Sequence, residues 1–220
     1  MRGTGDGVGR GGLLMAELSS LSVRATAIAE ALRVIDPEWR CSWTPADVLG
    51  LAVAAGSVRQ GGFLLEVGAG FSTGILASSL PHSDCQMASV DTSPAACRLA
   101  RAASTVPVIL CEAIAALSPS YAWSADIDVL VLDGEHTRAF ALWYIENLWP
   151  CVRSGGQIVI HDMHDISGSR GEFETVMGTL WERGWKHTRT AHDKPSVGAW
   201  AEVLHAAPGV RNCLLVVTKP

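Results

Sequence analysis

The sequence predicts an α/β fold: a doubly wound, mostly parallel sheet with helices on both faces and a helical cap at the N-terminus. Three observations lead to this prediction. Short apolar runs alternate with stretches of helical length, several of these runs end in glycine-rich or acidic turns, and two strand-like runs close the chain. The 220 residues, 48% of them hydrophobic and 18% charged, suffice for one domain with a sizeable core.

The first 60 residues divide into a tail and a cap. Residues 1–12 are rich in glycine and carry no apolar pattern, so we expect a disordered tail. Residues 13–60 form the predicted cap. Its first helix, 13–34, has apolar residues at helical spacing, and its second runs from the Thr44-Pro45 pair, a typical cap and first residue, to about residue 55. Residues 61–220 form the main domain.

A glycine-rich turn follows the first predicted strand, 63–67. Gly68 and Gly70 would let a ligand approach the backbone, and a helix that starts near Ser72 or Thr73 offers free N–H groups to a negative atom. Thr73 occupies the third glycine position of a dinucleotide fingerprint, and Glu66 would repel a pyrophosphate but suit a cationic ligand. The alternative, an ordinary strand, turn and helix with packing glycines, stays open.

Two further strands are expected beyond this turn. The run 86–90 ends in Asp91, about 20 residues past the glycines, where a carboxylate can accept hydrogen bonds from a ribose diol or cap the next helix. The run 106–111 is followed by Glu112 and Ala113.

Polar residues also end the next two strands. The apolar run 129–132 leads into Asp133-Gly134-Glu135-His136, and after a helix at 139–148 a glycine pair turns the chain into a strand at 157–160 that ends in His161-Asp162. Because ligands bind at the carboxyl edge of such sheets, these groups should lie together. A helix at 172–183 and strands at 185–190 and 213–218 complete the chain.

Two motifs carry a resemblance to a known family. Glu66-Val-Gly-Ala-Gly-Phe-Ser-Thr73 resembles the first motif of class I methyltransferases that use S-adenosylmethionine (SAM). A second resemblance is to a branch of this family that methylates hydroxyl groups of small molecules such as sugars, polyketides or phenols. It is carried by the D-G-E-H segment at 133–136, the helix that follows, and the S-G-G-Q-I-V-I-H-D segment at 154–162. The resemblance implies a Rossmann-like sheet that an antiparallel C-terminal strand closes. It also implies a set of cofactor-binding residues: Glu66, Gly68, Ala69, Gly70, Ser72, Thr73, Asp91, Thr92, Glu112, Ala113 and Asp133.

Transfer to a hydroxyl group needs a base or a metal ion, because the hydroxyl proton must leave. His136 is the first candidate base, and Asp133 and His161 are the other catalytic candidates; each histidine could instead be bonded within its loop. Catechol-type relatives hold magnesium with acids at both strand ends, here Asp133 and Asp162, and with an Asn or Asp after the second.

In this sequence the position after Asp162 is Met163, which cannot bind a hard cation, and His164 or Asp165 would have to substitute through a shifted loop. If no metal binds, the two acids would orient His136 or the methionine amine of the cofactor.

Other functions and partners are weighed on composition. N- or C-methylation, a dehydrogenase that uses NAD and a non-catalytic SAM-binding protein are the alternatives. A net charge of −5 without a basic stripe argues against nucleic acid, and apolar runs too short for a bilayer argue against a membrane. Six cysteines without a C-x-x-C pair suggest a cytoplasmic enzyme without zinc or disulfides. Such enzymes often pair, so a homodimer is expected.

Overall fold

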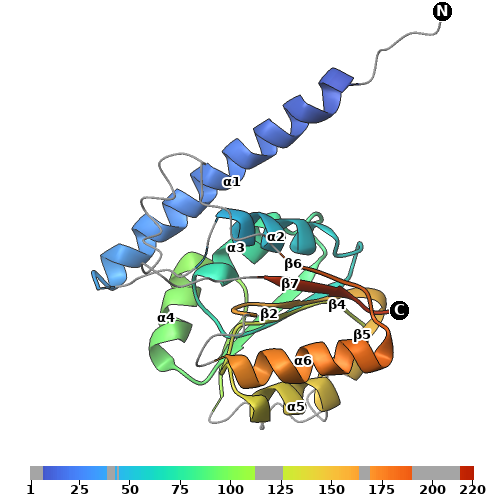
Figure 1. Cartoon of the computed structure of the whole chain (residues 1–220). Helices are drawn as coiled ribbons and strands as arrows, with labels where there is room; N and C mark the ends of the chain where they lie inside the picture. Colours follow the sequence, from blue (N-terminus) through green and yellow to red (C-terminus); the bar gives the residue numbers. More distant parts are fainter. Residues whose placement is uncertain (1–6, 39–42, 44, 112–125, 164–168, 190–213) are drawn as a thin grey trace, which may run out of the picture.

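The computed structural model describes residues 7–38, 43, 45–111, 126–163, 169–189 and 214–220. Within them, one sheet of seven strands has the order β3-β2-β1-β4-β5-β7-β6 (Figure 1). Strand β7 runs antiparallel to both of its neighbours, and the other pairings are parallel, as predicted. The strands are β1 (Phe63–Val67), β2 (Gln86–Asp91), β3 (Val108–Leu110), β4 (Ile127–Leu132), β5 (Val152–Ile160), β6 (His187–Arg189) and β7 (Leu215–Thr218).

Helices cover both faces of this sheet, which confirms the doubly wound architecture (Figure 1). Leu64 of β1 packs in a core cluster with residues of the first three helices, whereas its neighbour Leu65 packs in a second cluster with residues of the last two. Every residue of β4 is buried, as its apolar run predicted. The helices are α1 (Gly7–Ile35), α2 (Pro45–Gly56), α3 (Phe71–Ser79), α4 (Pro94–Ala103), α5 (Arg138–Asn147) and α6 (Arg170–Arg183).

The N-terminal boundary differs from the prediction. Helix α1 begins at Gly7, so the expectation of a disordered tail at residues 1–12 is wrong for residues 7–12. Once a helix is nucleated, each further residue adds one backbone hydrogen bond, and this lets α1 extend into the glycine-rich segment. In Figure 1 this end of α1 projects beyond the rest of the domain.

Strand β5 also begins earlier than predicted. The glycine pair at 155 and 156 lies inside the strand rather than before it. The three residues of β4 from Ile127 to Val129 span the same register as the six residues of β5 from Val152 to Gln157, so β5 carries a bulge at the glycines. Gly155 takes the positive φ of 72° that this bulge needs.

The ends of the helices agree with their capping residues. Ser93 accepts a hydrogen bond from the backbone N–H of Ala96 at the start of α4, directly after β2. Gly184 ends α6 in the left-handed conformation. The Ser93 cap holds the start of α4 close to the end of β2, at the edge that the sequence predicts to carry the site.

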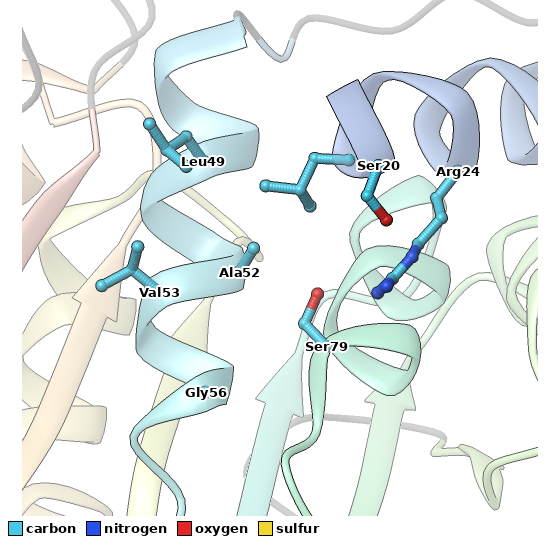
Figure 2. Close-up of a pocket in the computed structure, with 8 residues that line it drawn as sticks. Ser20, Arg24, Leu49, Ala52, Val53, Gly56 and Ser79 are labelled. Carbon is cyan, nitrogen blue, oxygen red and sulfur yellow. The ribbon is translucent and has the colours of Figure 1, made fainter. Parts of the chain in front are cut away.

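A cavity of about 340 Å³ lies between α1, α2 and the end of α3, away from the predicted site residues (Figure 2). Arg24 crosses from α1 to donate a hydrogen bond of 2.6 Å to the carbonyl of Ser78 beside it. The residues that line this cavity are Ser20, Leu21, Arg24, Leu49, Ala52, Val53, Gly56 and Ser79. None of them is a predicted site residue. Among the helices that the structure describes, none is both long and apolar enough to cross a membrane.

Candidate active site

The glycine turn between β1 and α3 packs tightly on one side and faces open space on the other. Gly68, with φ of 100°, donates from its N–H to Val90 at 2.9 Å, and a Cβ at this position would lie 1.9 Å from the carbonyl oxygen of Asp133. Gly68 therefore allows the close approach of the loop after β4, and its predicted contact with a ligand stays a prediction. A Cβ on Gly70 would meet nothing within 4 Å, so a ligand can approach the turn there.

Glu66 lies beneath this turn. It is completely buried, and its carboxylate accepts hydrogen bonds from the hydroxyls of Ser72 (2.5 Å), Thr73 (2.6 Å) and Ser89 (2.6 Å). Burial raises the pKa of Glu66 to about 7, although the three hydroxyls oppose the rise. The predicted direct contact between Glu66 and a cationic ligand does not fit this geometry, and we assign Glu66 to holding the turn in shape.

The hydrogen bonds of Thr73 explain why it replaces the third glycine. Its hydroxyl accepts from the N–H of Gly70 at 3.0 Å while it donates to Glu66. A side-chain hydroxyl is therefore part of the turn, and a glycine in this position would leave both partners without their bond. Ser72 and Thr73 are both buried, so they support the turn from inside.

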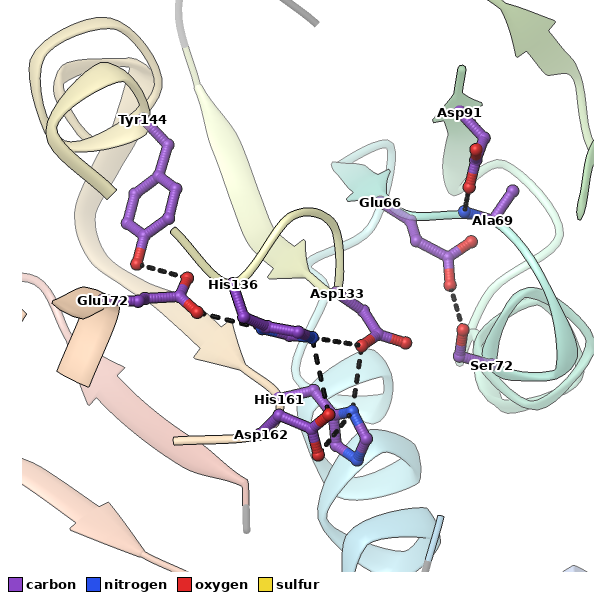
Figure 3. Close-up of polar contacts among 10 residues, drawn as sticks. All are labelled: Glu66, Ala69, Ser72, Asp91, Asp133, His136, Tyr144, His161, Asp162 and Glu172. Carbon is purple, nitrogen blue, oxygen red and sulfur yellow. Dashed lines mark hydrogen bonds and ion pairs between the residues drawn. The ribbon is translucent and has the colours of Figure 1, made fainter. Parts of the chain in front are cut away.

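Asp91 joins the second strand to the same turn (Figure 3). One carboxylate oxygen accepts from the N–H of Ala69 at 2.8 Å, and the other accepts from Ser93 at 2.6 Å. The side chain thus organises both the glycine turn and the start of α4. Asp91 remains partly exposed, and its neighbour Thr92 is exposed. That these two residues bind the ribose of the cofactor stays a prediction. Glu112 and Ala113 lie outside the described residues.

His136 is surrounded by three carboxylates from three different segments (Figure 3). Its Nδ1 lies 2.9 Å from Glu172, and its Nε2 lies 3.4 Å from Asp162 and 3.9 Å from Asp133. Asp162 follows β5 with φ of 54°, a region that few residues other than glycine adopt, and this turn directs its carboxylate toward His136. The predicted meeting of the two strand ends is confirmed.

The charges of the cluster shift its pKa values in opposite directions. Burial favours the neutral form of His136, but the hydrogen bond to Glu172 and the charges of Glu172, Asp133 and Asp162 outweigh it and raise the pKa above 6.5. Burial likewise favours the neutral form of Asp133, yet His161 and His136 hold the pKa of this carboxyl below its usual value. The cluster therefore favours charged histidine next to charged carboxylate.

His161 is buried on the other side of Asp133. Its Nδ1 lies 2.9 Å from Asp133, and its ring stacks on Trp43 with the centroids 3.6 Å apart. Burial lowers the pKa of His161, but Asp133, Asp162 and Asp47 together raise it. With its side chain 1% exposed, His161 has little surface for a substrate, so the geometry favours a role in orienting Asp133 over the predicted catalytic role.

The described residues do not fit the predicted magnesium ion. They contain no group of three histidine, cysteine or acidic side chains placed to hold a metal. Asp133 and Asp162 instead face the ring nitrogens of two histidines, and Met163 is buried with a thioether that hard cations do not bind. His164 lies outside the described residues. We therefore derive no catalytic step through a metal.

Two members of the cluster were missed by the sequence analysis. Glu172 lies in the first turn of α6, and Tyr144 of α5 donates its hydroxyl to Glu172 at 2.9 Å. In the sequence, an acid in the first turn of a helix reads as an ordinary favourable charge, and a tyrosine on an apolar face reads as core. Only the packing of α6 on α5 brings them to His136.

Comparison with known proteins agrees with this fold. Residues 65–163, which include the glycine turn, Asp133, His136 and Asp162, match the model of a family described as a methyltransferase domain. Residues 65–163 are a methyltransferase domain by this match. The match confirms the resemblance on which the sequence analysis relied, and it disfavours the dehydrogenase alternative. No curated protein sequence matches the chain.

Several solved methyltransferases share the fold over nearly the whole chain. The O-methyltransferase from Bacillus cereus, in complex with S-adenosylhomocysteine (SAH), is 16% identical with a TM-score of 0.63, over 89% of this chain and 90% of that one. The O-methyltransferase TomG from Streptomyces achromogenes, involved in tomaymycin synthesis and in complex with SAM, is 17% identical with a TM-score of 0.60, over 90% of both chains.

A third neighbour is a SAM-dependent O-methyltransferase from Thermotoga maritima. It is 15% identical with a TM-score of 0.58, over 86% of this chain and 70% of that one. At these identities the neighbours establish the fold of the methyltransferase domain, and its own side chains must indicate the chemistry.

Proposed function

We propose that this protein transfers a methyl group from SAM to a hydroxyl group of a small molecule. One observation carries the proposal: the open glycine turn and the His136 cluster meet at one edge of the sheet, joined by the contact of Gly68 with Asp133. When bound, SAM supplies a methyl group that is already activated on its sulfonium. The protein then has to align two ligands and accept one proton.

The cofactor half of the site consists of the glycine turn and Asp91. The open side of Gly70 gives the ligand access to the backbone, and Glu66 keeps the turn in shape from beneath. Asp91 and Thr92 are suited to the ribose, because they lie at the end of β2 beside Ala69. Asp133 lies between this half and the histidine cluster, and its carboxylate would face the methionine amine.

The acceptor half centres on His136. A carboxylate can only accept, so Nδ1 of His136 carries the proton that Glu172 binds, and Nε2 is the nitrogen left to take the proton of the acceptor. The raised pKa of His136 has a consequence for pH: the base is available only above that pKa. The acid limb of the activity profile should therefore lie above pH 6.5.

A hydroxyl acceptor fits this cluster better than a nitrogen or carbon acceptor. N- and C-methylation have less need of a base, whereas His136 is held in one orientation by a buried acid. The O-methyltransferases that share the fold, TomG among them, support the same choice. We also propose a homodimer and a cytoplasmic location, the latter supported by the free thiols of Cys85, Cys97, Cys111 and Cys151.

The proposal is tested by methyl transfer from labelled SAM to a panel of phenols, sugars and polyketide hydroxyls. The wild-type protein should methylate at least one class of hydroxyl. A His136→Ala variant should bind SAM with unchanged affinity and lose on the order of 10²- to 10⁴-fold in turnover, the usual contribution of a positioned base. Turnover that does not change in His136→Ala would remove His136 as the proton acceptor.

A further inference from the structure

Glu172 is a buried acid that no predicted role includes. Glu172 is 1% exposed, and its carboxylate contacts Nδ1 of His136 at 2.9 Å with one oxygen and the hydroxyl of Tyr144 at 2.9 Å with the other (Figure 3). A buried carboxylate is costly unless it is paired and hydrogen-bonded. Among the ion pairs of the described residues, His136 is the group that gives Glu172 a positive partner.

The packing of α6 on α5 brings this acid to His136. Gly171 passes so close to the start of α5 that a Cβ there would lie 3.3 Å from Cβ of Arg138. Thr137 caps α5 by accepting from the N–H of Phe140, which fixes the segment directly after His136. The packing of α6 on α5 therefore sets the position of Glu172, and the Thr137 cap ties the segment that carries His136 to the start of α5.

The direction of the hydrogen bonds has a chemical consequence. Tyr144 donates to one oxygen of Glu172, so that oxygen is committed, and the other oxygen accepts the Nδ1 proton of His136. The imidazole is thereby held in the tautomer that leaves Nε2 directed toward Asp162 and Asp133 (Figure 3). Without Glu172 the ring could turn, and either nitrogen could carry the proton.

We infer that Glu172 is a positioning residue, held by Tyr144, which fixes the tautomer and orientation of the His136 ring for proton transfer. The inference rests on the proposed function for its catalytic part. Its structural part, the tautomer of His136, can be measured without any turnover. A purely structural Glu172, which only links α5 to α6, would affect stability and leave the imidazole unchanged.

The first test is nitrogen-15 NMR of the histidine side chains, with the His136 signal assigned by its loss in His136→Asn. In the wild-type protein above the pKa of His136, the remaining proton should be on Nδ1. A proton on Nε2 would overturn the inference. This measurement needs no variant of Glu172, so it remains decisive if such a variant fails to fold.

The second test compares Glu172→Gln with Glu174→Gln, the same change on the same helix at an exposed residue that pairs with Arg170. Glu172→Gln should lower the pKa of His136, move the acid limb of kcat/KM to lower pH, and reduce the plateau kcat on the order of 10- to 100-fold with the KM for SAM unchanged. Glu174→Gln should behave as wild type.

Two outcomes separate the inference from the proposed function. If Glu172→Gln is folded and leaves the His136 tautomer, pKa and kcat unchanged, Glu172 has no positioning role. If the protein transfers no methyl group but the NMR result is as expected, the proposed function fails while the assignment of Glu172 as the residue that orients His136 stands.

Discussion

Glu66→Gln tests how the glycine turn is built. The substitution removes a completely buried carboxylate and keeps the size and shape of the side chain. The glutamine amide can still bond to the hydroxyls of Ser72, Thr73 and Ser89, whose own protons can rotate to suit it. The variant should therefore fold, and its stability should depend on pH in a different way from that of the wild type.

The size of the effect follows from the pKa. Glu66 has an ordinary value of 4.5 and a folded value of about 7, so the folded state binds its proton more tightly than the unfolded state does. Below pH 4.5 both states are protonated, and burial of the carboxyl costs nothing extra. As the pH rises from 4.5 toward 7, Glu66 ionises in the unfolded chain but stays protonated in the folded protein. The free energy of unfolding then falls by about 1.4 kcal/mol for each pH unit, which amounts to on the order of 3 kcal/mol between the two pKa values.

Denaturant unfolding at pH 5 and pH 8 measures this loss. The free energy of unfolding of Glu66→Gln minus that of the wild type should rise by on the order of 2 kcal/mol from pH 5 to pH 8. The histidines contribute equally to both proteins, so their effect cancels in this difference. Glu174→Gln is the exposed control and should follow the wild type. Parallel pH dependence of the wild type and Glu66→Gln would show that Glu66 ionises normally, and our account of the turn would be wrong.

Two other outcomes follow from the geometry of the same edge. Gly68→Ala would bring a Cβ to 1.9 Å from the carbonyl oxygen of Asp133, on a residue with a φ of 100°. The variant should therefore lose on the order of 3 kcal/mol or more of its free energy of unfolding, and it should no longer bind SAM. The helical control Gly178→Ala, which meets nothing within 4 Å, should gain about 0.5–1 kcal/mol, and equal behaviour of the two variants in thermal unfolding would refute the close approach. Because Asp133 and Asp162 face histidine nitrogens, calorimetry with Mg²⁺ or Mn²⁺ should show no binding at this edge and chelator should leave turnover unchanged; metal binding that Asp133→Asn abolishes would contradict the donor analysis.

The sequence predicted the edge of the sheet that carries the site because this depends on local patterns. Parallel strands that each end in a polar residue must present those residues together, and Asp133, His136 and Asp162 do meet. The helices on both faces of the sheet also agree with the prediction, since continuous apolar runs such as β4 require cover on both faces.

The sequence could not predict which groups would be buried. Glu66 looked like a ligand contact because its three hydroxyl partners come from two separate segments, α3 and β2. His161 looked like a catalytic candidate because nothing in the pattern revealed that Trp43 would stack on it. Glu172 was missed because it lies 36 residues from His136, and only the packing of two helices makes them partners.

Calorimetric titration of the wild-type protein with SAM and SAH tests the central claim most directly. The account predicts that both bind one site per chain with micromolar or tighter affinity, a free energy of about −8 kcal/mol or better, and that Gly68→Ala abolishes the binding. A folded wild-type protein that binds neither compound would contradict the claim that this edge of the sheet is the cofactor site of a SAM-dependent methyltransferase.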